Sequence, residues 1–182
     1  MARPSRRDVL LDAAERIVRD KGANHLTFDA VAAEANTSKG GLLYHFASKD
    51  ELVAAMVERL VASFDGSLNA HAAADKSATG RWTRAYVATT AAPDGRSADD
   101  MTASALLAAV ACNPGLIEPL RDRYRVWREA AAADGIAPED ALIAMLAADG
   151  LWIADLLGFA PPTGELRARL IERMGQLARG AG

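Results

Sequence analysis

Apolar residues recur along this chain at intervals of three and four, the spacing that places them on one face of an α-helix. No stretch alternates apolar and polar residues over the length that a β-strand needs, and alanine, the best helix former, is abundant. The pattern therefore predicts an all-α protein of about nine helices.

The first predicted helix begins after Ser5, whose side chain can cap it, and ends at Gly22. A second, short helix follows Thr27, and a third runs over residues 38–46. Between these two, Asn36 can adopt the left-handed conformation that a tight turn requires. We expect a helix-turn-helix packed against the first helix.

Residues 48–51, Ser-Lys-Asp-Glu, form a capping box that begins a fourth helix, and the apolar stripe of this helix extends to Phe64. Polar residues, prolines and glycines then divide the rest of the chain into about five further helices. We expect an N-terminal three-helix domain over residues 1–50 and a C-terminal helical domain over residues 51–182.

Composition places the chain among ordinary globular proteins, because 51% of its 182 residues are hydrophobic and 25% are charged. The net charge of −3 argues against indiscriminate nucleic-acid binding. With no signal sequence, no apolar run long enough to span a membrane and one cysteine, Cys112, the chain is expected to be cytoplasmic. Cys112 is expected to pack as a small apolar residue, and the scattered histidines predict neither a metal site nor a cofactor.

The predicted turn and third helix carry side chains suited to DNA. Thr27 and Ser38 stand at helix N-termini, where free N–H groups can face a phosphate. Lys39 can reach a guanine edge or a phosphate. The expected DNA contacts are Thr27, Thr37, Ser38, Lys39, Gly40, Gly41, Tyr44, His45 and Lys49.

The pair Gly40 and Gly41 needs an explanation, since each glycine costs a helix about 1 kcal/mol relative to alanine. Close approach of the backbone to DNA supplies one. The alternative is a plain three-helix packing unit, with Tyr44, His45 and Lys49 as solvated surface residues.

From Thr27 to Leu52 the chain reads Thr-Phe-x-x-Val-Ala-x-x-Ala and then, from Ser38, Ser-Lys-Gly-x-Leu-x-Tyr-His-Phe-x-Ser-Lys-x-x-Leu. In order and spacing, this segment closely resembles the DNA-binding domain of the tetracycline-repressor (TetR) family. The resemblance implies an all-helical homodimer with an effector-binding C-terminal domain. It also implies that the residues expected to contact DNA touch mainly its phosphates.

Two positions depart from the family pattern. Asn36 stands where the family usually has glycine, and both residues accept the turn. Leu43 stands where the family often has an aromatic residue, which leaves one expected phosphate contact open.

Large apolar side chains in the second part of the chain suggest a site for a small hydrophobic effector of unknown identity. The expected ligand-binding residues are Phe64, Trp82, Tyr86, Met101, Trp127 and Trp152. The alternative is that these side chains simply fill the core.

The last two predicted helices, over residues 137–157 and 165–178, resemble the dimerising pair of the family, and two copies could form a four-helix bundle. The helical spacing puts Asp149 on the apolar stripe of the first of these two helices, where a carboxylate needs a partner. We expect that partner to be an arginine across the dimer; the less favoured alternative is a cationic effector that binds Asp149. The expected interface residues are Leu142, Leu146, Asp149, Gly150, Ile153, Leu170, Met174 and Leu177. The alternative is that these faces pack within one chain.

These observations favour a DNA-binding regulator, a repressor that a small molecule releases from a palindromic operator. The alternatives are a helical enzyme with a tryptophan-lined active site and a helical adaptor that binds only protein. The chain shows no catalytic motif, so no catalytic residue is predicted.

Overall fold

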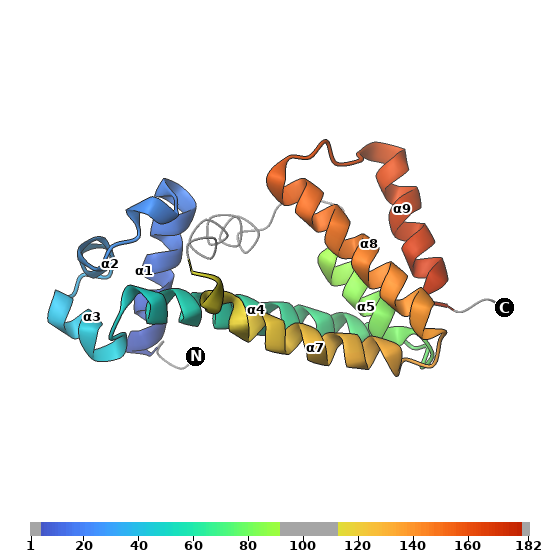
Figure 1. The fold of residues 1–182 in the computed structure, drawn as a ribbon, viewed down its shortest axis with the longest axis horizontal. Coiled ribbons are helices and arrows are strands. Elements are labelled where there is room, and N and C mark those ends of the chain that lie inside the picture. The colour runs from blue at the N-terminus through green and yellow to red at the C-terminus, as the bar shows by residue number, and fades with distance from the viewer. Residues whose placement is uncertain (1–4, 92–112, 180–182) are drawn as a thin grey trace. The chain divides into compact units, whose positions relative to one another are not determined.

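The computed structural model describes residues 5–91 and 113–179, and all regular structure in these ranges is helical (Figure 1). The α-helices are α1 (Arg6–Lys21), α2 (Phe28–Glu34), α3 (Lys39–His45), α4 (Lys49–Ala74), α5 (Arg81–Thr90), α7 (Glu118–Ala132), α8 (Pro138–Leu157) and α9 (Gly164–Leu177). Two 3₁₀ helices, η1 (Ala23–His25) and η2 (Pro114–Ile117), complete the set. The prediction of an all-α fold is confirmed.

The described residues form two compact units, residues 5–61 with 113–120 and residues 62–91 with 121–179. The long helices α4 and α7 contribute residues to both. Met101 and Cys112 lie outside the described residues. The predicted domain boundary near residue 50 remains a prediction.

In the first unit, α2 and η1 pack on α1, and α3 packs on α2. The Ser5 hydroxyl accepts a hydrogen bond from the Asp8 N–H at 3.1 Å, and the Asp8 carboxylate accepts one from the Ser5 N–H at 3.2 Å, so a capping box begins the helix. Apolar side chains of α1 to α4 form one core with Leu116 of η2. Each fully buried leucine, valine or phenylalanine stabilises this core by about 1.5–3 kcal/mol.

The turn between α2 and α3 is made as the sequence predicts. Asn36 has φ +50°, the left-handed conformation, and follows the last residues of α2. The Asn36 N–H donates to the Ala33 carbonyl at 3.1 Å and the Thr37 N–H to the Ala32 carbonyl at 2.8 Å. This pair of bonds is a Schellman motif, which satisfies the last carbonyls of α2 before the chain enters α3.

Helix α4 differs from the prediction in two details. The Ser48 hydroxyl caps it by accepting from the Glu51 N–H at 3.1 Å, but the Glu51 carboxylate accepts from the Ala47 N–H and not from that of Ser48. The helix also continues beyond Phe64 to Ala74. Leu68, one turn after Phe64, is buried and continues the apolar stripe, and the alanines at 72–74 favour helix up to its end.

In the second unit, α5, α8 and α9 pack on one another. Small side chains allow close packing, because Ala144 and Ala148 of α8 are fully buried beside Val87 of α5 and Met174 of α9. The predicted bounds of the last two helices agree with α8 and α9 within one residue. Figure 1 shows these two helices as neighbours joined by the segment 158–163.

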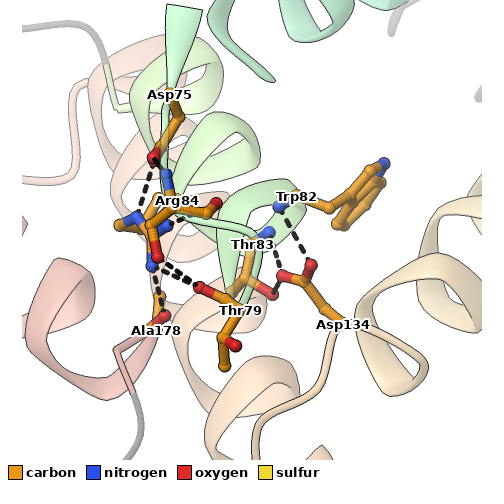
Figure 2. Close-up of polar contacts among 8 residues, drawn as sticks. Asp75, Thr79, Trp82, Thr83, Arg84, Asp134 and Ala178 are labelled. Carbon is orange, nitrogen blue, oxygen red and sulfur yellow. Dashed lines mark hydrogen bonds and ion pairs between the residues drawn. The ribbon is translucent and has the colours of Figure 1, made fainter. Parts of the chain in front are cut away.

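A carboxylate distant in sequence caps the start of α5 (Figure 2). Asp134 accepts hydrogen bonds from the Trp82 N–H at 3.1 Å, the Thr83 N–H at 2.7 Å and the Thr83 hydroxyl at 2.8 Å. Its own carbonyl accepts from the Gly80 N–H at 2.8 Å. These four bonds fix the first turn of α5, and with it the position of Trp82.

Arg84, one turn further along α5, joins three segments of the second unit. Its guanidinium pairs with Asp75 at 2.7 Å and donates to the carbonyls of Thr79 at 3.0 Å and Ala178 at 2.8 Å (Figure 2). Hydrogen bonding to Arg84 lowers the pKa of Asp75. The arginine therefore ties the end of α4 and the end of α9 to α5.

Candidate nucleic-acid interface and aromatic cluster

The helix α3 is anchored by two side chains and leaves the rest of its surface exposed. Leu42 and Phe46 are fully buried in the core of the first unit. Arg7 of α1 covers the Phe46 ring, with its guanidinium carbon 5.2 Å from the ring centroid. The anchored face therefore fixes which side chains of α3 point to solvent.

The exposed face of α3 carries the residues that the sequence singles out for DNA. Tyr44 is 87% exposed, the highest value among the exposed large hydrophobic residues, and Lys39 and Gly40 of the same helix are also exposed. His45 is half-buried, with its ring 5.2 Å edge-on from that of Tyr44. Lys49 is exposed at the first turn of α4. The structure thus brings together an exposed group of cationic and aromatic side chains on α3 and the adjoining end of α4.

The hydroxyl groups at the helix ends have partners within the protein. Thr27 accepts from the Ala30 N–H at 3.2 Å, and Ser38 accepts from the Gly41 N–H at 3.1 Å. Both side chains are exposed, and Thr37 beside them is half-buried. Each cap engages only one N–H group of its helix, and the expected phosphate contacts at these helix ends remain a prediction.

The two glycines of α3 have different surroundings. A Cβ placed on Gly41 would lie 2.8 Å from the Thr37 hydroxyl, so this glycine has a reason within the chain. A Cβ on Gly40 would meet only the Ser38 hydroxyl, at 3.9 Å. Nothing within the described protein requires Gly40 to lack a side chain.

Lys39 is already paired in the isolated chain. Its ammonium group lies 3.1 Å from the Asp29 carboxylate of α2, and both side chains are more than half exposed. Solvent screens such a pair, so Lys39 can exchange this partner at little cost. Leu43, the departure from the family pattern, is 45% exposed.

In the second unit, aromatic rings from three helices gather into one cluster. The Phe64 ring of α4 lies 5.4 Å from Tyr86 of α5 and 4.7 Å from Trp127 of α7. Tyr86 also stacks on Trp82 at 5.4 Å, and Tyr124 contacts Trp127 at 5.9 Å. We call Phe64, Trp82, Tyr86, Tyr124 and Trp127 the aromatic cluster.

Four of the six residues predicted to bind a ligand thus lie together. Their contacts with one another are compatible both with a ligand site and with the alternative that they fill the core. Trp152 is half-buried on α8, and Met101 is outside the described residues. Tyr124 also joins the cluster. The only feature of the sequence that points to this is its spacing of three residues from Trp127, which places both on one face of the helix.

Asp149 of α8 bonds to two tyrosines of the cluster. The Tyr86 hydroxyl donates to Asp149 Oδ1 at 2.8 Å, and the Tyr124 hydroxyl donates to Oδ2. Burial raises the pKa of Asp149 to about 6, partly offset by the Tyr86 hydrogen bond. Burial and the Asp149 charge raise the pKa of Tyr86, which keeps its hydroxyl protonated as a donor.

A second carboxylate, Asp65 of α4, touches the cluster from another side. It accepts from the Trp127 indole N–H at 2.8 Å and pairs with Arg123 of α7 at 2.7 Å. The negative charge of Asp65 is therefore compensated by a guanidinium, in contrast to that of Asp149.

Helices α8 and α9 expose an apolar row that coincides only in part with the predicted interface. Met174 is buried in the core of its own chain, Leu177 packs against that core, and Asp149 bonds to tyrosines of its own chain. Within its own chain, the Asp149 carboxylate bonds to tyrosines and not to an arginine; a pairing with an arginine across a dimer remains a prediction. The exposed row consists of Ile143, Leu146, Gly150, Ile153 and Leu157 of α8 with Leu166 and Leu170 of α9.

Of the predicted interface residues, Leu146, Gly150, Ile153 and Leu170 lie on this exposed apolar row, and Leu142 is half-buried. Ile143 and Leu157 were missed. The spacing 143, 146, 150, 153, 157 is a continuous three-and-four repeat, so the sequence carried the signal.

No group of three or more histidine, cysteine, aspartate or glutamate side chains among the described residues could hold a metal ion. No described helix combines the length and the apolar character needed to cross a membrane.

Comparisons with known proteins bear on both units. Residues 10–56 match the family model for bacterial regulatory proteins of the tetR family, and residues 80–179 match the tetracyclin repressor-like C-terminal domain. A search of curated protein sequences found no match.

Three solved structures illustrate the likeness. A TetR-family member from Streptomyces coelicolor A3 is 25% identical, with a TM-score of 0.71 over 96% of this chain and 98% of that one. The multidrug-binding protein EbrR, complexed with malachite green, is 28% identical, with a TM-score of 0.66 over 96% and 98%. A putative transcriptional regulator from Saccharomonospora viridis, in complex with choline, shares the fold at 20% identity, with a TM-score of 0.72 over 95% of each chain.

The two family models cover the helix-turn-helix and most of the second unit, and they agree with the resemblance that the residues from Thr27 to Leu52 show. The chain belongs to the TetR family of bacterial transcriptional regulators.

Proposed function

We propose that this protein is a homodimeric repressor that binds a palindromic operator through α3 and leaves it when a small molecule binds the aromatic cluster. The observation that carries the DNA-binding part is the geometry of α3: Leu42 and Phe46 hold it in the core, while Lys39, Gly40 and Tyr44 face solvent. A helix presented in this way can enter the major groove. The family models describe regulatory proteins, which favours this function over the enzyme alternative.

The exposed apolar row on α8 and α9 supports dimerisation. Leu146 is 62% exposed and Ile143 52% exposed, and a row of such side chains on two adjacent helices gains stability when a second copy covers it. Gly150 lies in the middle of the row with open space around it, so two helices can approach closely there. A dimer also supplies the two recognition helices that a palindromic site needs, one helical turn of about 34 Å apart.

The aromatic cluster supports effector binding, because rings with a few fixed polar groups are typical of small-molecule sites. EbrR, which shares the fold, binds malachite green, and this supports a ligand site in the second unit. Helix α4 carries Lys49 at one end and Phe64 of the cluster further along, so a ligand that prefers one tilt of α4 would change the position of the DNA contacts. A coupling of about 1–3 kcal/mol would release the operator 5- to 150-fold.

The test is binding of the full-length protein to the DNA that flanks its own gene, measured against salt concentration. Lys49→Ala is expected to weaken binding to operator and to unrelated DNA alike and to lower the magnitude of the salt slope by about one unit, because it removes a single phosphate contact. Asp122→Asn, a change at an exposed carboxylate of α7, is the control. Unchanged affinity and slope for Lys49→Ala would overturn the proposed contacts.

A further inference from the structure

The carboxylate of Asp149 lacks a positive partner among the residues that the structure describes. Its hydrogen bonds come from the hydroxyls of Tyr86 and Tyr124, and no lysine, arginine or histidine contributes to its electrostatic environment. Hydroxyl groups solvate a negative charge but do not neutralise it. An ionised carboxylate withdrawn from water without an opposite charge is costly.

Asp65 shows what a compensated carboxylate in the same unit looks like. It has the Arg123 guanidinium at 2.7 Å as well as the Trp127 indole N–H at 2.8 Å. The aromatic cluster therefore touches two carboxylates, and only the charge of Asp149 is left for another molecule to balance.

The rings add to this preference. Both tyrosines that bond to Asp149 belong to the aromatic cluster, and Trp82 stacks on Tyr86 with centroids 5.4 Å apart. The faces of aromatic rings carry negative potential and attract cations, most strongly the face of tryptophan. Tyr124, Trp82 and Asp149 are each half-buried, so part of each is open to contact.

We propose that the effector of this regulator is an organic cation, with its positive charge beside Asp149 and its apolar body against the aromatic cluster. This inference rests on the proposed function for the effector role, but the binding preference follows from the site alone. A neutral molecule of the same shape would leave the Asp149 charge unbalanced. An anion would be repelled both by the carboxylate and by the ring faces.

The experiment measures direct binding of two dyes to the full-length protein near pH 7.5. Malachite green carries a delocalised positive charge, and its reduced form, leucomalachite green, has the same three rings on a tetrahedral central carbon and no charge, so the change between wild type and variant, and not the wild-type ratio alone, isolates the effect of charge. Wild-type protein is expected to bind the cation at least about 10-fold more tightly than the uncharged form. Asp149→Asn keeps an acceptor for the tyrosines but removes the charge, and is expected to weaken cation binding about 10- to 100-fold and binding of the uncharged form less than about 2-fold.

Asp122→Asn is the matched control, since it removes the same charge at a site that is 68% exposed and is expected to leave both affinities unchanged. If Asp149→Asn binds malachite green as tightly as the wild type, the inference is wrong. Should thermal melting show that this variant does not fold, Trp82→Leu decides instead: a loss of about 2- to 30-fold for the cation alone supports the inference, and an equal loss for both dyes overturns it.

Operator release is measured separately, so that the two proposals can fail independently. If malachite green binds through Asp149 but leaves the protein on its operator, the proposed function loses its effector and the cation site stands. If only uncharged molecules bind and release the operator, the proposed function stands and the cation site is wrong.

Discussion

The contacts that stabilise the first unit differ in kind from those that stabilise the second. In the first unit, the turn and the start of α3 depend on groups near one another in sequence, although Arg59 also pairs with the distant Asp12: Asn36 turns the chain between two adjacent helices, and Ser38 caps the helix that it begins. In the second unit they are far apart, since Asp134 caps α5 from 51 residues away and Tyr86 bonds to Asp149 across 63 residues. The placement of α3 therefore depends on neighbouring residues, whereas the start of α5 and the position of Asp149 depend on individual bonds between distant residues.

The largest expected effect on stability distinguishes the buried side chain that anchors α3 from the exposed side chain that is proposed to contact DNA. Phe46→Ala removes a fully buried ring and is expected to lower the free energy of unfolding by about 3–5 kcal/mol. Tyr44→Ala, two residues earlier at an 87% exposed position, is expected to change it by less than about 0.5 kcal/mol but to weaken operator binding. Urea unfolding and operator binding measured on both variants check the contrast, and equal loss of stability would break it.

In the second unit, the next largest effect on stability is expected at Gly80. Gly80 has φ +68°, and a Cβ there would lie 1.7 Å from the Ala178 carbonyl oxygen, so Gly80→Ala is expected to cost about 3 kcal/mol. Gly66→Ala is the control: this helical glycine has open space around it, and alanine is expected to stabilise the protein by about 1 kcal/mol. Thermal unfolding of both variants measures the difference, and a neutral Gly80→Ala would show that the close approach to Ala178 is not needed.

A smaller effect concerns pH. Because the pKa of Asp149 is raised from 3.8 to about 6 in the folded protein, the folded state holds this proton more tightly than the unfolded state. The contribution of the protonated Asp149 to the free energy of unfolding is therefore fully present below pH 4 and is lost as the pH rises through 6. Asp149→Asn is therefore expected to be more stable than the wild type by about 1–2 kcal/mol at pH 7.5, with the advantage vanishing near pH 4.

Urea unfolding at several pH values checks that prediction. Asp155→Asn is a useful contrast, because Asp155 pairs with Arg167 at 2.7 Å and its replacement is expected to destabilise the protein at neutral pH. An Asp149→Asn variant less stable than the wild type at pH 7.5 would contradict the assigned environment.

The smallest effect on stability tests the two glycines of α3. Gly40→Ala fills open space within the protein and is expected to raise stability by about 1 kcal/mol, yet to weaken operator binding if the DNA backbone approaches there. Gly41→Ala meets the Thr37 hydroxyl at 2.8 Å and is expected to gain less stability. Operator affinity of Gly40→Ala equal to that of the wild type would remove the argument for close approach at this position.

What the sequence could predict follows the same division. The cap at Ser5, the turn at Asn36 and the bounds of α8 and α9 depend on neighbouring residues and repeating intervals, and they were predicted correctly. The cap that Asp134 provides could not be predicted, because nothing around this residue points to α5. For Asp149, the helical interval suggested the outer stripe, but only packing shows that it faces Tyr86.

The interface residues show an intermediate case. The apolar repeat identified the correct pair of helices, but Met174 was assigned outward although it lies in the core. The apolar residues of α9 form one stripe, and spacing alone does not reveal that a neighbouring helix covers Met174 but leaves Leu166 and Leu170 exposed.

The ion pair between Asp29 and Lys39 bears on the state of α3 before DNA arrives. The carboxylate 3.1 Å away holds the Lys39 side chain beside Asp29 of α2. Both side chains are more than half exposed, so water and salt screen the pair, and its loss costs at most about 1 kcal/mol. This small cost is the same for every DNA sequence, so the pair orders the free side chain without changing which sequence the protein prefers.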